Sequence, residues 1–226
     1  MEQVPQKDKK QEKSQMKNFI DIRQNSENSM LKNGIPCHPN LPLLDFKRTR
    51  SSTQVADKII SLYCLAGVAN GADGGSLLEW LTDSGSLSSV DVRDREILKI
   101  SRPSKKLLNE LSWKQESLYT LCWIAGIVND MTWPDRECDL SEVFSEIPPE
   151  IQIEDFKRSL SLRADEVVVE VLDLYYCLNA SLMHPELWSN RDGAKGLKIE
   201  VVLERRQALE WACSEGISWE EISLNT

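Results

Sequence analysis

The residues most suggestive of chemistry lie on one stripe of a predicted helix, where a glutamate falls between two tryptophans. Trp113, Glu116, Thr120, Trp123 and Ile127 recur at helical spacing, so Glu116 shares a face with apolar side chains. A carboxylate in such surroundings either pairs with a cation or helps to hold a small polar ligand. We therefore expect Glu116 to be partly buried.

Other charged residues share apolar helical stripes in the same way. They are Asp173, Glu204 and Arg205. A buried carboxylate is costly unless it is paired. We therefore expect Glu116 or Asp173 to meet Arg205 or Arg163 across the core.

Two interpretations of these residues remain open. In the first, they form a buried ion-pair network that fixes the register of the helices. In the second, charged groups point into a pocket lined by Trp113, Trp123 and Trp211, which would hold a small polar ligand. The complete candidate set is Trp113, Glu116, Trp123, Asp173, Glu204, Arg205 and Trp211.

Several catalytic motifs are missing from the sequence. The triplet from Trp133 to Asp135 is similar to the acid loop of tyrosine phosphatases, but no cysteine has the arginine six positions later that this chemistry needs. The only histidines, His38 and His184, lack neighbours at zinc-ligand spacing. No glycine-rich phosphate loop or nucleophile elbow is present. We expect no metal site, no catalytic set and no cofactor.

Composition and charge argue against several classes of protein. A net charge of -9 argues against a nucleic-acid binder, since phosphate affinity comes from clustered lysine and arginine. The longest apolar run, 118–128, is far shorter than the roughly 20 residues of a membrane helix. No apolar stretch follows the charged N-terminus, as a secretory signal would require. We expect a cytoplasmic protein that does not bind membranes, with reduced cysteines.

The pattern along the chain predicts an all-α protein. We expect a disordered basic tail over 1–17 and a single globular helical domain over 18–226. The predicted helices cover about 17–33, 53–70, 76–82, 90–100, 104–128, 139–147, 164–183 and 198–214, with a short one around Phe156. Within these, Ser104 is a predicted N-cap, a break is expected near Ser112, and Asp139 with Glu142 forms a predicted capping box.

The sequence resembles a bacterial family called domain of unknown function 4272. The resemblance rests on the segments 111–118 (LSWKQESL), 121–128 (LCWIAGIV), 133–135 (WPD), 138–139 (CD), 204–211 (ERRQALEW), 219–222 (WEEI) and 225–226 (NT). It extends from about Arg23 to the end. The family implies a bacterial, intracellular, helical protein without an assigned activity.

Three functional hypotheses follow. The first is a non-catalytic module that binds another protein or its own copy, with Trp80 or Trp188 on an exposed apolar patch. The second is an enzyme or ligand-binding protein with a pocket around Glu116, Arg205 and neighbouring tryptophans. The third and weakest is nucleic-acid docking through the lysines of the tail.

Overall fold

A computed structural model of the chain describes residues 6–44, 47–141, 143–188 and 196–225, with side chains from residue 18 onward. The α-helices are α1 (Gln6–Lys32), α2 (Ser52–Ala69), α3 (Gly74–Asp83), α4 (Val92–Leu98), α5 (Lys105–Ser112), α6 (Lys114–Ile124), α7 (Ile153–Ser159), α8 (Asp165–Met183) and α9 (Ile199–Cys213). Short 3-10 helices are η1 (Leu87–Ser89), η2 (Phe144–Glu146), η3 (Pro185–Leu187) and η4 (Trp219–Glu221). None of the described residues lies in a β-strand, so the predicted all-α fold is confirmed.

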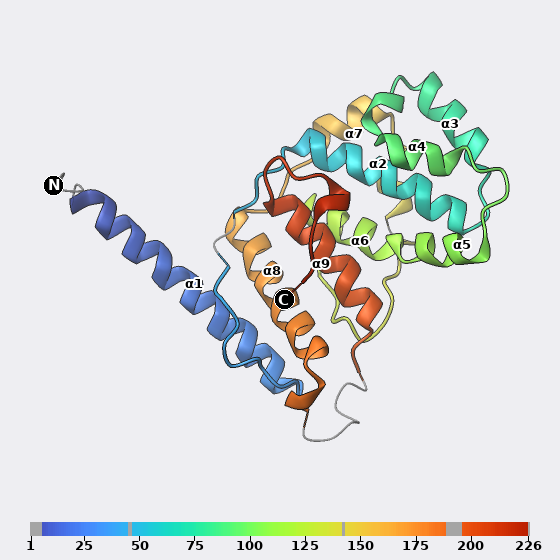
Figure 1. Ribbon diagram of the computed structural model, residues 1–226. Coiled ribbons are helices and arrows are strands. Elements are labelled where there is room, and N and C mark those ends of the chain that lie inside the picture. The colour runs from blue at the N-terminus through green and yellow to red at the C-terminus, as the bar shows by residue number, and fades with distance from the viewer. Residues whose placement is uncertain (1–5, 45–46, 142, 189–195, 226) are drawn as a thin grey trace.

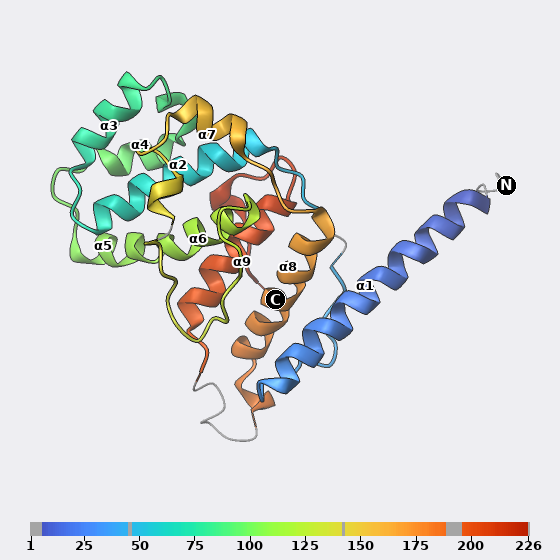
Figure 2. The same cartoon turned by 180° about the vertical axis from the view of Figure 1, so that it is seen from behind.

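Helix α6 forms the centre of the molecule, and every residue over 116–124 is buried. It packs against both α2 and α9, and α9 packs in turn against α8. Helices α3, α4, α5 and α7 contact α2, while the C-terminal half of α1 lies along α8 (Figure 1). The N-terminal half of α1 extends away from the other helices, as the view from behind shows (Figure 2).

Hydrogen bonds at the helix ends follow the sequence signals. Ser51 caps α2, where its hydroxyl accepts from the Gln54 amide and the Gln54 side chain accepts from the Ser51 amide. Ser104 caps α5 by accepting from the amide of Leu107 at 3.2 Å. The expected break near Ser112 is present, because α5 ends there and α6 begins at Lys114.

The structure departs from the expected elements in three places. The first is the end of α6, which lies at Ile124 rather than at Val128. The helix predicted over 139–147 is wrong: only η2 forms there, and the carboxylate of Asp139 accepts from the amide of Ser141, two residues on. The predicted partner in that capping box, Glu142, lies outside the described residues. Helix α1 begins at Gln6 rather than near Lys17. The disordered tail stays a prediction, since residues 1–5 and the side chains of 6–17 lie outside the description.

Candidate functional site

The predicted charged residues Glu116 and Arg205 lie together in the core between α6 and α9. The Arg205 Nε donates to Glu116 Oε2 at 2.8 Å, and both side chains are 0% exposed. The other carboxylate oxygen of Glu116 accepts from the backbone amide of Cys138 at 2.7 Å. The pair therefore ties two helices and a loop together, as expected of a structural ion pair.

The remaining donors of Arg205 are also engaged. Its Nη1 donates to the hydroxyl of Tyr175 at 3.0 Å and to the carbonyl of Thr132, and its guanidinium lies 5.0 Å from the ring centroid of Tyr119. Burial raises the pKa of Tyr175 to about 12, although Arg205 acts in the opposite direction. Tyr175 is thus a neutral phenol at physiological pH, and the network has no spare charge with which to bind a ligand.

Asp173 has a different partner from the one expected. It accepts from Arg23 of α1, with Nη2 to Oδ1 at 2.8 Å, and both side chains are buried. Arg163 instead donates to backbone carbonyls, including that of Trp123 at 2.7 Å, and stacks over the Trp123 ring at 4.8 Å. Of the pairings that the sequence left open, the structure therefore shows that of Glu116 with Arg205.

The three tryptophans expected in one pocket lie in separate places. Trp123 is buried against Arg163, and Trp211 is buried between Arg50 and Trp219, at 4.7 Å and 5.6 Å respectively. Of the three, Trp113 lines the cavity described next. The three side chains have different neighbours, and the tryptophan-lined pocket around Glu116 and Arg205 stays a prediction.

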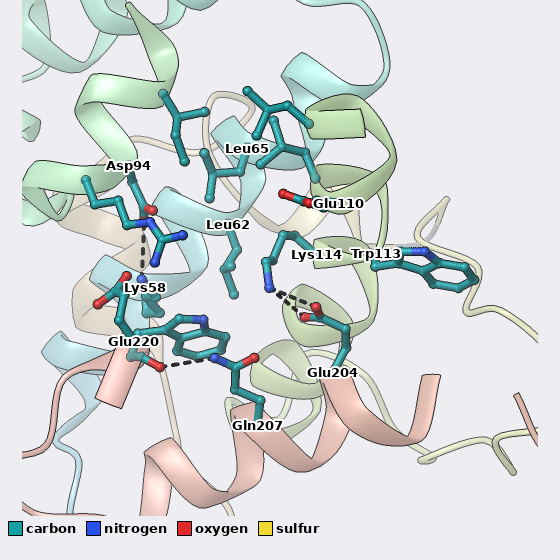
Figure 3. A pocket seen from close by; sticks show the side chains of 15 residues that line it. Lys58, Leu62, Leu65, Asp94, Glu110, Trp113, Lys114, Glu204, Gln207 and Glu220 are labelled. Carbon is teal, nitrogen blue, oxygen red and sulfur yellow. Dashed lines mark hydrogen bonds and ion pairs between the residues drawn. The ribbon is translucent and has the colours of Figure 1, made fainter. Parts of the chain in front are cut away.

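A different cavity, of about 380 Å³, opens between α2, α4, α5, α6, α9 and η4. Figure 3 shows charged side chains around it and leucines between them. Its lining residues are Lys58, Leu62, Leu65, Arg93, Asp94, Ile97, Leu107, Glu110, Leu111, Trp113, Lys114, Glu204, Gln207, Trp219 and Glu220. Trp113 and Glu204 are the members of the predicted set that line it.

One wall of this cavity carries what we call the Lys58 cluster: Lys58 and Ser61 of α2 with Asp94 of α4. The carboxylate of Asp94 accepts from Lys58 Nζ at 3.1 Å and from Ser61 Oγ at 2.5 Å. Lys58 also pairs with Asp91 at 2.7 Å, and its ammonium lies 4.8 Å from the ring centroid of Trp219. The lysine side chain is only 5% exposed, so these contacts hold its ammonium group in position.

A second group repeats this arrangement; we call it the Lys114 cluster. It consists of Lys114 and Ser117 of α6 with Glu204 of α9. Lys114 Nζ donates to the two oxygens of Glu204 at 2.8 and 3.0 Å, and Ser117 Oγ donates to Oε2 at 2.6 Å. In both clusters a lysine and a serine three residues apart lie on one helical face and bind a carboxylate from another helix.

A further cavity, of about 360 Å³, lies beside the loop after α6. Its lining includes Tyr119, Asp130, Thr132 and Asp139, but none of the predicted site residues. Within the described parts of the chain, no three His, Cys, Asp or Glu side chains are grouped as a metal site requires. Among the described helices, none has the length and apolar character needed to cross a membrane.

The comparison with known protein families gave a match that covers most of the chain. The family model for a domain of unknown function (DUF4272) matches residues 22–222. The chain belongs to the DUF4272 family. Neither the comparison with curated proteins nor that with solved structures gave a match. The matched range of this DUF4272 member includes both lysine clusters and all residues that line the 380 Å³ cavity.

Sequence reasoning missed the most buried charged residues of the cavity, Lys58 and Asp94. A signal for Lys58 was present, because it shares a helical face with Val55 and Leu62 and is followed by two isoleucines. A lysine on such a stripe needs a buried partner, as Glu116 does. Asp94 offered no comparable signal, since α4 is short and largely polar.

Proposed function

We propose that this DUF4272 protein binds a small organic molecule in the 380 Å³ cavity. The observation that carries the proposal is the pair of lysine clusters, which place buried and half-buried charges on the walls of a cavity with an apolar floor. Pockets for small ligands commonly measure roughly 300 to 1,000 Å³ and combine apolar surface with a few fixed polar groups. The cavity has both properties.

The Lys114 cluster supports a binding role because it remains partly accessible. The side chains of Lys114 and Glu204 are 21% and 16% exposed, whereas Glu116 and Arg205 are fully buried. A ligand in the cavity can reach the first pair and not the second. Trp113 is half-buried at the same end and offers an aromatic surface.

The test is a ligand-observed NMR screen of a small-molecule library against the wild type and a variant with a filled cavity. Leu107→Trp adds bulk to the cavity from α5, where Leu107 is half-buried. Molecules that bind the wild type should lose their signals with this variant.

Leu78→Trp is the matched control, because Leu78 is equally half-buried but belongs to α3 and does not line the cavity. This variant should retain the wild-type ligands. A screen in which both variants keep every ligand would place binding elsewhere and contradict the proposal.

Protein binding is the second candidate function, and it has less support. Trp80 and Trp188 are both half-buried against the core, and Trp188 Nε1 donates to the Ser181 carbonyl at 3.0 Å. The largest exposed fractions among apolar residues belong instead to Val92, Leu31 and Met183, at 66%, 62% and 61%. Light scattering of the purified protein distinguishes self-association from a monomer.

A bacterial cytoplasmic location is also part of the proposal. Its support is the set of free thiols, since reduced cysteines are typical of the cytoplasm. Fractionation of the source cells, followed by immunodetection, tests it directly.

A further inference from the structure

Negative charge prevails on the walls of the 380 Å³ cavity. Among the described lining residues the carboxylates are Asp94, Glu110, Glu204 and Glu220, and the cations are Lys58, Arg93 and Lys114. Two charged neighbours lie next to the lining, Asp91 beside Lys58 and Lys106 beside Glu110, and together they leave the excess of one carboxylate unchanged. Since charge of one sign on low-dielectric walls attracts the opposite sign, the cavity favours a cation.

Both lysines already have anionic partners, so they are poorly suited to bind an anionic ligand. Lys58 lies 2.7 Å from Asp91 and 3.1 Å from Asp94, and Lys114 lies 2.8 Å from Glu204. An incoming carboxylate or phosphate would have to displace one of these ion pairs. It would then leave a partly buried carboxylate without its cation, which is costly.

Two other carboxylates are not bound to Lys58 or Lys114 and can meet a ligand. Glu220 of η4 has no hydrogen bond or ion pair from its side chain within the described parts of the chain. Glu110 of α5 has only Lys106 at 3.8 Å, and both side chains are mostly exposed. Figure 3 shows Glu110 and Glu220 at opposite sides of the cavity, with Leu62 between them.

The surface between these carboxylates is aliphatic. It is built from Leu62, Leu65, Ile97, Leu107 and Leu111. Leu62 and Leu111 are buried, so this floor is held by the core. A chain of methylene groups suits such a floor, because burying it is favourable by roughly 25 cal/mol per Å² of apolar surface.

We propose that the ligand is an aliphatic diamine or polyamine, whose ammonium groups meet Glu110 at one end and Glu220 at the other while its methylene chain covers the leucines. This inference rests on the proposed function and gives its ligand a chemical class. Among the cations of the lining, Arg93 has no anionic partner in the described part of the chain, and it is exposed. Its charge opposes the ligand, so removing it should strengthen binding.

The experiment is isothermal titration calorimetry with putrescine, cadaverine and spermidine at low ionic strength. The wild type should bind at least one of them. Glu110→Gln and Glu220→Gln should each weaken that binding about fivefold, as expected of ion pairs at partly exposed sites. Arg93→Gln should strengthen it by a similar factor, and added salt should weaken it.

Glu79→Gln is the matched control for non-specific attraction to an acidic protein. Glu79 is exposed on α3, does not line the cavity, and its loss changes the net charge by the same amount. If Glu79→Gln weakens binding as much as Glu110→Gln, the amines associate with the surface in general and the proposal is overturned. All these positions are exposed, so thermal unfolding should verify that each variant folds.

Glutarate separates this inference from the proposed function. It has the same number of carbons as cadaverine but carries a carboxylate at each end in place of an aminomethyl group. One possible result is that glutarate binds, that Leu107→Trp abolishes this binding and that no amine binds. The diamine proposal is then overturned, but the cavity keeps its binding role. If no amine binds, and the NMR screen finds no ligand sensitive to Leu107→Trp, both proposals fail.

Discussion

Glu116 and Arg205 form a fully buried ion pair between residues 89 positions apart, and its loss should lower stability without affecting the cavity. Glu116→Gln leaves the Arg205 guanidinium uncompensated in the core. We expect the free energy of unfolding to fall by about 3 kcal/mol or more. Urea unfolding measures the change, and ligand binding by the folded variant should match the wild type.

Glu79→Gln again serves as the control, because Glu79 is exposed. Its free energy of unfolding should stay within about 0.5 kcal/mol of the wild type. Lost ligand binding by a folded Glu116→Gln protein would contradict a purely structural role for the pair. It would mean that Glu116 acts on the ligand directly, although it does not line the cavity.

At the scale of elements, local signals predicted well the helices that carry a long apolar stripe, even where no side chain caps the N-terminus. Helix α8 was expected over 164–183 and covers Asp165–Met183, and α9 was expected over 198–214 and covers Ile199–Cys213. The failure over 139–147 has a local cause. The Asp139 carboxylate accepts from the amide two residues on, a turn geometry that competes with a helix start.

The N-cap of α5 lies at the start of the helix that carries Glu110. Ser104→Ala removes the side-chain acceptor for the Leu107 amide, so we expect the free energy of unfolding to fall by about 1 kcal/mol. Ser101→Ala is the control, since Ser101 is exposed and lies outside the helix. Equal effects of the two substitutions, measured by urea unfolding, would argue against the cap.

The N-cap of α3 should make stability depend on pH. The backbone amide of Ser76, and then its hydroxyl, donate to the Asp73 carboxylate and hold its pKa below the ordinary range. The ionised carboxylate therefore stabilises the fold above the ordinary aspartate pKa. This contribution is lost as the pH falls through the lowered folded-state pKa.

Asp73→Asn tests this dependence, because asparagine can cap a helix but carries no charge. The difference in free energy of unfolding between the wild type and this variant should be largest near neutral pH and vanish at the acid end. Urea unfolding at a series of pH values measures it. A difference that does not change with pH would rule out ionisation as its source.

At the scale of the whole molecule, the sequence predicted the burial of some charged residues, such as Glu116, but it missed that of Lys58 and Asp94 and did not predict every pairing. The pairing of Glu116 with Arg205 was among the alternatives that helical spacing left open. Asp173 pairs with Arg23, 150 positions away, because α1 packs along α8, and no periodic pattern shows such docking. The cavity was unpredictable for the same reason, since its walls come from six separate elements.

The packing of the whole molecule should also control the reactivity of the thiols. Burial raises the pKa of Cys64 and Cys213 to about 12, so at neutral pH both are protonated as well as shielded. Cys37 is half-buried in the segment after α1. Although burial also raises its pKa, its access to solvent should make it react with iodoacetamide well before Cys64 and Cys213.

Peptide mapping after timed labelling of the native protein measures these rates. The same labelling in urea is the control, and there the differences among the three thiols should disappear. Cys64 and Cys213 lie on α2 and α9, the helices that enclose α6, so their labelling requires the core to open. If either reacts as fast as Cys37 in the native protein, the core opens locally. The cavity, which shares α2 and α9, would then be less rigid than a preformed binding site requires.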